Sequence, residues 1–164
     1  VSTSGLVSQI PLVTESGVRL AVSLNAPNDE IRDVIMPINK KYPLKDLLAA
    51  CKEHAEKSRD RVTFEYVLLK GINDDIEHAR MVYNLIKNIP CKLNLIPFNE
   101  HPDSGYTRPE SRKVYHFQSQ LLNKGIHTTI RRTMGRDIYA ACGQLTSLYK
   151  EKPTHQEVAT GVLG

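Results

Sequence analysis

Short β-branched runs alternate along this chain with longer stretches in which apolar residues recur at helical spacing. The clearest run, residues 61–69, is rich in valine, leucine and aromatic residues and predicts a strand. The helical stripe over residues 44–55 includes Cys51, which is therefore predicted to lie in the core. Strands are predicted at residues 18–24, 61–69, 92–98 and 126–133, and helices near 10–13, after 28, and at 44–55, 76–89 and 109–124.

Strands and helices follow one another at intervals of roughly 30 residues, which is typical of successive βα units. We therefore expect an α/β fold with a parallel sheet. Asp74 and Glu77 predict a capping box at the start of the helix over 76–89, and Pro90 ends that helix. The chain opens without methionine at residues 1–5, which look like the exit of a strand, so we expect a piece of a longer protein.

Polar side chains without a fixed charge follow three of the predicted strands. They include Ser2 at the start of the chain, Ser23 and Asn25 on either side of Leu24, and Asn99. Ligands of α/β proteins gather at the carboxyl ends of strands, so we expect a shared pocket that hydrogen-bonds a ribose or an amino-acid group. Ordinary turn chemistry also explains such residues at any single position.

The composition is that of an ordinary globular chain, with 40% hydrophobic and 24% charged residues. A formal charge of +4 permits a nucleic-acid partner without requiring one. The three cysteines form no CxxC pair and no zinc pattern, so no metal site is predicted and a reducing, cytoplasmic setting fits best. No apolar run approaches the ~18 residues of a membrane span, so no membrane partner is expected.

Cys142 differs from the other cysteines because it lies outside any apolar periodic run. It stands between Ala141 and Gly143, a few residues after Arg131 and Arg132. A thiol near cationic side chains tends toward the thiolate, the form that attacks electrophiles. Burial in the core is the alternative, since free cysteine is among the most buried residue types.

Five segments together resemble one family, the RlmN-type adenine-methylating enzymes of the radical S-adenosylmethionine (SAM) superfamily. They are Ser-Thr-Ser-Gly at 2–5, Ser-Leu-Asn-Ala-Pro-Asn-Asp at 23–29, Pro-Ile-Asn-Lys-Lys-Tyr-Pro at 37–43, Asn-Leu-Ile-Pro-Phe-Asn at 94–99 and Asp-Ile-x-Ala-Ala-Cys-Gly-Gln-Leu at 137–145. The resemblance implies part of a TIM-like (β/α)6 barrel with helices outside a parallel sheet. Residues 1–149 would form the C-terminal portion of this catalytic barrel and residues 150–164 a tail.

The resemblance also implies roles for matched residues. Ser2, Ser23, Leu24, Asn25 and Asn99 would line the SAM pocket, although position 25 is more often histidine in relatives. Cys142 would be the methyl-carrying cysteine. Its thiolate would take a methyl group from one SAM, and a radical formed from a second SAM would abstract hydrogen from that S-methyl group. The methylene radical would then add to carbon-2 of an adenine.

The partners are likewise those that the resemblance implies. The RNA would be 23S ribosomal RNA and, for many members, transfer RNA, and an electron donor such as flavodoxin would serve the parent protein. A 4Fe–4S cluster would be held by a CxxxCxxC motif, which is absent from these 164 residues. This absence agrees with the expectation of a piece of a longer protein that cannot complete the reaction alone.

Three arginines are candidate RNA contacts, because Arg131, Arg132 and Arg136 precede the Cys142 segment and suit phosphate binding. The loop at 105–108, which contains Tyr106, is a further candidate for stacking on RNA. A solvated strand edge and an ordinary surface loop are the alternatives for these two segments.

Three other functions stay open from the sequence. A sister family that methylates carbon-8 of the same adenine (Cfr-like enzymes) shares the cysteine segment. A metal-free α/β-barrel enzyme that binds a phosphorylated metabolite is disfavoured, because no Gly-rich phosphate loop is present. A non-catalytic RNA-binding α/β module would bind RNA without any need for Cys142.

Overall fold

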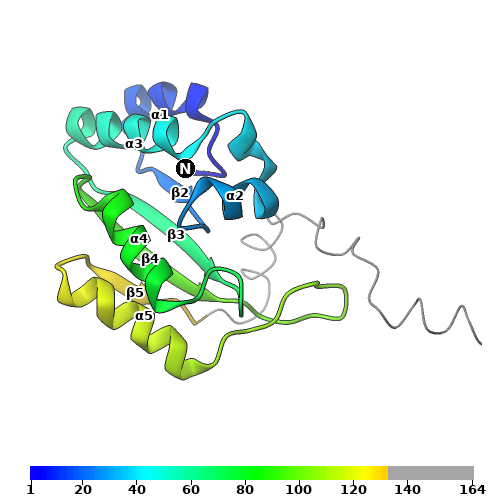
Figure 1. The fold of residues 1–164 in the computed structure, drawn as a ribbon. Helices are drawn as coiled ribbons and strands as arrows, with labels where there is room; N and C mark the ends of the chain where they lie inside the picture. Colours follow the sequence, from blue (N-terminus) through cyan, green and yellow to red (C-terminus); the bar gives the residue numbers. More distant parts are fainter. Residues whose placement is uncertain (133–164) are drawn as a thin grey trace, which may run out of the picture.

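Five parallel strands form the centre of the molecule. A computed structural model describes residues 1–132 (Figure 1). The strands are β1 (Ser2–Thr3), β2 (Ala21–Ser23), β3 (Val62–Leu68), β4 (Cys91–Pro97) and β5 (Thr128–Ile130). They lie in the order β1-β2-β3-β4-β5, and every neighbouring pair is parallel. All five carboxyl ends therefore lie at one edge of the sheet, called here the carboxyl edge.

The helices connect successive strands, as parallel pairing requires. They are α1 (Ile10–Ser16), α2 (Asp29–Ile35), α3 (Leu44–Ser58), α4 (Ile76–Ile86) and α5 (Ser111–Asn123), with short 3-10 turns η1 (Val7–Gln9) and η2 (Pro37–Lys40). Apolar side chains of α1, α3, α4 and α5 pack with alternate residues of the sheet in one core cluster. Phe64 and Tyr66 of β3 and Leu93 and Leu95 of β4 are fully buried there.

A second apolar cluster closes the carboxyl edge over β3 and β4. Val67 and Ile96 contribute to it from the strands, and Ile35 and Met36 contribute from the end of α2. Tyr106, in the loop after β4, completes it with a T-shaped contact to Phe98 at 5.7 Å between ring centroids. The ring of Tyr106 is therefore part of the core in this structure, rather than an exposed surface for stacking.

The predicted α/β fold with a parallel sheet is confirmed, and Cys51 lies fully buried in the main core, as expected. The predicted capping box was displaced by one residue. Asp75 is the N-cap of α4 and pairs reciprocally with His78, while Asp74 accepts a hydrogen bond from the backbone N–H of Gly71 at 3.0 Å. Within residues 1–132, no helix is long and apolar enough to span a bilayer.

Candidate functional site at the carboxyl edge

Arg32 of α2 ties together the ends of β1 and β2. Its side chain is completely buried, and its guanidinium donates hydrogen bonds to backbone oxygens at both strand ends. Nε bonds the carbonyl of Leu24 at 3.0 Å, and Nη2 bonds the carbonyls of Ser23 at 2.9 Å and Ser4 at 2.8 Å. The remaining arm, Nη1, bonds Oδ1 of Asn39 at 3.0 Å. These bonds fix the backbone of two segments in which cofactor contacts are predicted.

The surroundings of Arg32 preserve its charge. Burial lowers the pKa of Arg32 to about 10, against the opposing effect of Asp29, so the guanidinium stays protonated at neutral pH. Asn39 links the arginine to two carboxylates by donating to Oδ1 of Asp29 at 2.9 Å and of Asp33 at 2.7 Å. Gly5 has φ +121°, and a Cβ there would lie 3.1 Å from Nη2 of Arg32. The glycine of the Ser-Thr-Ser-Gly segment thus makes room for the buried guanidinium.

Asn25 and Asn73 join the ends of β2 and β3 in a similar way. Asn25 has φ 57°, and its Oδ1 accepts a hydrogen bond from the N–H of Val67 at 2.8 Å. Nδ2 of Asn73 donates to the carbonyls of Asn25 at 2.7 Å and Val67 at 2.8 Å. Oδ1 of Asn73 accepts from the N–H of Leu69 at 2.7 Å. Both asparagines are at least 99% buried, so they satisfy backbone groups that water does not reach.

The face of the sheet opposite the main core carries a polar row. Ser23, Glu65, Asn94 and Thr129 stand in register across β2 to β5. Oγ1 of Thr129 bonds Oδ1 of Asn94 at 2.6 Å, and the Arg131 guanidinium pairs with Glu65 at 3.7 Å. Hydroxyl, amide and carboxylate groups therefore line this face at the end of β2 and at the middle of β3, β4 and β5.

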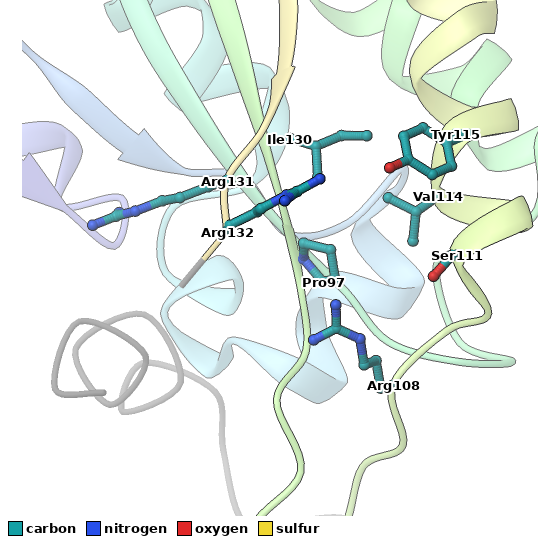
Figure 2. A pocket seen from close by; sticks show the side chains of 8 residues that line it. All are labelled: Pro97, Arg108, Ser111, Val114, Tyr115, Ile130, Arg131 and Arg132. Atoms are coloured by element: carbon teal, nitrogen blue, oxygen red, sulfur yellow. The ribbon is translucent and has the colours of Figure 1, made fainter. Parts of the chain in front are cut away.

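A cleft of about 360 Å³ opens at the carboxyl edge, on the helix side of β4 and β5 (Figure 2). It lies between the ends of these two strands and the first turns of α5. The lining residues are Pro97, Arg108, Ser111, Val114, Tyr115, Ile130, Arg131 and Arg132.

No family model matches the chain. A comparison with curated proteins does find a clear relative. The chain is 56% identical, over 163 residues, to a protein of Bdellovibrio bacteriovorus named dual-specificity RNA methyltransferase RlmN. The match covers 99% of this chain and 41% of that protein. The chain is similar to one part of an RlmN-type radical SAM methyltransferase. It spans about two fifths of the length of the curated relative that it matches.

Solved structures agree with this similarity. A radical SAM methyltransferase from Sphaerobacter thermophilus superposes with a TM-score of 0.78 at 41% identity, over 89% of this chain and 43% of that one. A domain of the pyruvate-formate lyase-activating enzyme of Bacteroides vulgatus gives a TM-score of 0.63 at 17% identity, over 80% of this chain and 79% of that one. The second likeness concerns the fold alone.

Four of the five residues predicted to contact SAM lie at or after the carboxyl ends of β2 and β4, whereas Ser2 begins β1 and is in register with Ala21 and Thr63, near the amino end of β3. Ser2 on β1 and Asn99 after β4 are exposed. Ser23 and Leu24 are buried, and their carbonyls bond Arg32. The Asn25 side chain bonds Val67 and donates to the Met36 sulfur at 3.3 Å. Direct contact of these five residues with a cofactor stays a prediction.

The chemistry of the residues present fits SAM but not the cluster. The polar row and the exposed hydroxyl of Ser2 offer donors and acceptors that suit a ribose and an amino-acid group. Over residues 1–132, by contrast, no group of three or more His, Cys, Asp or Glu side chains is placed to hold a metal. This part of the chain therefore offers hydrogen-bonding groups of the kind that SAM needs and, among residues 1–132, no ligand set for an iron–sulfur cluster.

The two cysteines in the described part of the chain are poor nucleophiles. Burial raises the pKa of Cys51 to about 12 and that of Cys91 to about 11, so both are thiols at neutral pH. The predicted methyl carrier, Cys142, lies outside the described residues, as do Arg136 and the tail at 150–164.

Sequence reasoning missed Arg32, Asn39 and Asn73. Arg32 follows acidic residues on a short helix and looks like part of a solvated face. Its main partners are backbone carbonyls, which leave no mark in the side-chain pattern. The sequence offered one signal for these residues: Asn39 is a polar residue inside the segment at 37–43 that resembles the RlmN-type family. The loop at 105–108 does contribute to a candidate site, through Arg108 rather than through Tyr106.

Proposed function

We propose that this chain supplies one side of the SAM pocket and the methyl-carrying cysteine of an enzyme that methylates carbon-2 of adenine in 23S ribosomal RNA and in transfer RNA. The observation that carries the proposal is the 56% identity to an RNA methyltransferase named for dual specificity, over a span that includes the Cys142 segment. These substrates also imply a cytoplasmic location and, for the parent protein, an electron donor such as flavodoxin.

The described residues would hold and orient the cofactor from the polar face and the carboxyl edge of the sheet. Ser2, Asn99 and the polar row present hydrogen-bonding groups, while Arg32 keeps the loops after β1 and β2 in one conformation. When bound, SAM supplies the methyl group and, on reduction, the means to remove a hydrogen atom. Such chemistry is needed because carbon-2 of adenine is electron-poor and does not attack a methyl donor itself.

Cys142 would act as the nucleophile that accepts the methyl group. Its thiolate attacks a carbon that carries a good leaving group, and nearby cationic residues favour the thiolate over the thiol. Arg131 and Arg132 precede it in the sequence, which is consistent with this requirement. Cys51 and Cys91 are poorer candidates for the role, because burial raises the pKa of both thiols.

The test uses the full-length parent protein with its cluster reconstituted, SAM, a reductant and unmodified ribosomal or transfer RNA. The RNA is digested to nucleosides after the reaction and analysed by liquid chromatography and mass spectrometry. We expect 2-methyladenosine, and we expect none from Cys142→Ala. Cys91→Ala is the matched control, and its product should equal that of the unmodified enzyme.

Two results would contradict the proposal. Formation of 8-methyladenosine would assign the chain to the carbon-8 family instead. RNA binding with no methylated adenosine, from a protein with an intact cluster, would favour a non-catalytic RNA-binding module.

A further inference from the structure

The cleft beside α5 combines an apolar floor with an exposed aromatic ring. Pro97, Val114 and Ile130 form its floor, and the first and second of these are buried. Tyr115 stands at the wall with 51% of its surface exposed, although it lies next to a core residue on the same helix. A flat apolar surface of this kind suits a planar, uncharged group, because stacking removes the apolar faces of both partners from water.

Two guanidinium groups stand at the mouth of the cleft. Arg108 and Arg132 are both exposed, and in Figure 2 they approach Pro97 from opposite sides. Neither side chain forms an ion pair with another residue in the range 1–132. Arg131, in contrast, pairs with Glu65 of the polar row. Arg108 and Arg132 are therefore the cleft's available cations, and arginine is the side chain best suited to phosphate.

The start of α5 adds further donors on the same side. Ser111 lines the cleft at the first helical residue, and no side chain of the described residues caps the helix N-terminus. The N-cap residue is the exposed Glu110, whose side chain makes no capping hydrogen bond, and the first turn that follows it contains no acidic residue. The free N–H groups and the helix dipole of a 13-residue helix favour an anion at this position. The helix end and the two arginines thus point to one negatively charged group.

We propose that this cleft binds one unpaired nucleotide of the RNA substrate. The phosphate lies between Arg108, Arg132 and the first turn of α5, and the base packs against Tyr115. This inference rests on the proposed function and adds a substrate-binding position to it. The cleft opens at the ends of β4 and β5, the same edge as the predicted SAM pocket. RNA that places an adenine at that pocket therefore passes over this edge, within reach of the cleft.

The test measures RNA affinity by fluorescence anisotropy, with the full-length holoenzyme and a fluorescein-labelled, single-stranded 12-nucleotide RNA. The Arg108→Ala, Arg132→Ala double variant should bind about tenfold more weakly or worse, because charge-assisted bonds to phosphate are lost. The slope of log affinity against log salt should also become shallower by about 0.7 for one lost phosphate contact. Tyr115→Ala should weaken binding about tenfold through lost stacking, while Tyr115→Phe should retain it.

Arg19→Ala is the matched control. It removes one positive charge, half of what the double variant removes, from an exposed arginine at the opposite, amino end of the sheet, where Arg19 pairs with Asp60 at 3.4 Å. Its RNA affinity should stay within about twofold of the unmodified enzyme. A loss of binding free energy in this control of half that in the double variant, or more, would mean that only net charge matters, and would overturn the cleft proposal.

The same preparations separate this inference from the proposed function. Methylation of Cys142 by SAM alone, measured by peptide mass spectrometry, should be equal in Tyr115→Ala and in the unmodified enzyme. If Cys142 is methylated but the double variant binds RNA normally, the cleft proposal fails and the proposed function stands. Inorganic phosphate at about 10 mM, a concentration typical of weak anion binding, tests for a simple anion site. If this phosphate displaces the RNA and Tyr115→Ala has no effect on RNA affinity, the cleft binds anions and does not hold a nucleotide.

Discussion

Arginines occupy both ends of the carboxyl edge, and the two ends use them in opposite ways. Beside β1 and β2, the Arg32 guanidinium is completely buried and donates hydrogen bonds to three backbone carbonyls and one side-chain amide. Beside β4 and β5, Arg108 and Arg132 are exposed at the mouth of a cleft. The same side chain is part of the scaffold in one place and is available to a ligand in the other.

Burial decides between these roles. A buried guanidinium loses its hydration, and that cost is offset only when nearly every donor finds an acceptor in fixed geometry. The result is a rigid support that cannot turn toward a ligand. An exposed guanidinium keeps its hydration and its rotamer freedom, so it contributes little to stability and stays free to meet a phosphate.

The largest effect is expected for Arg32→Met. This change removes the guanidinium hydrogen bonds to three carbonyls, of which that of Leu24 keeps another donor, the N–H of Ala26 at 2.8 Å. It should lower the free energy of unfolding by about 3–5 kcal/mol. Arg32→Lys should recover only a small part of this loss, since one ammonium cannot reproduce the planar fork. Urea denaturation of the parent protein, followed by circular dichroism, measures both. A loss below about 1 kcal/mol for Arg32→Met would show that the hydrogen bonds of Arg32 contribute no stability.

Asn73→Ala should have the next largest effect. It removes three hydrogen bonds, one to the backbone after β2 and two to the end of β3, and should cost about 2–4 kcal/mol by the same measurement. Asn73→Asp is a close test of geometry, because it keeps the acceptor for Leu69 and loses the donor to Asn25 and Val67. Its stability should lie below that of the unmodified protein. Full stability of either variant would contradict the network described.

Asn25→His should be tolerated, with a loss of no more than about 1 kcal/mol. Histidine, like asparagine, is one of the residues enriched at positive φ, and a ring nitrogen can accept from the N–H of Val67. Asn25→Val is the informative contrast, because a β-branched residue at φ 57° is strained and offers no acceptor. Equal stability of the two variants would mean that the backbone at position 25 relaxes freely.

The smallest effect on stability is expected at the exposed end of the edge. Arg108→Ala and Arg132→Ala should each change the free energy of unfolding by less than about 0.5 kcal/mol, since neither side chain is buried or paired within the described chain. Stability and RNA affinity should both be measured for these variants and for Arg32→Met, because the two measurements together separate a structural arginine from a ligand-binding one. A stability loss near that of Arg32→Met would mean that the cleft arginines are structural as well.

The fold was predictable because its signals are local. Periodicity indicated the strands and helices of the parallel sheet, and polar residues after Leu24 and Phe98 indicated its functional edge. The capping residue of α4 was missed by one position, because Asp74 and Asp75 are chemically equivalent in sequence and only the turn at Gly71 separates their roles.

Arg32 and Asn73, which hold the loops at the carboxyl edge, were not predictable from the sequence pattern. Arg32 and Ser4 are 28 residues apart, and Asn73 and Asn25 are 48 residues apart. In both pairs one partner is a backbone carbonyl, which every residue possesses. Tyr106 misled for the opposite reason, because an aromatic residue in a polar loop suggests stacking on a ligand until packing against Phe98 is seen.

Peptide mass spectrometry of the three cysteines, in the full-length parent purified from cells, decides whether Cys142 is the methyl carrier. We expect an S-methyl group on Cys142 and none on Cys51 or Cys91, because burial raises the pKa of both of these thiols. An unmodified Cys142, in a protein with an intact cluster and SAM present, would contradict the assignment of this residue as the methyl carrier.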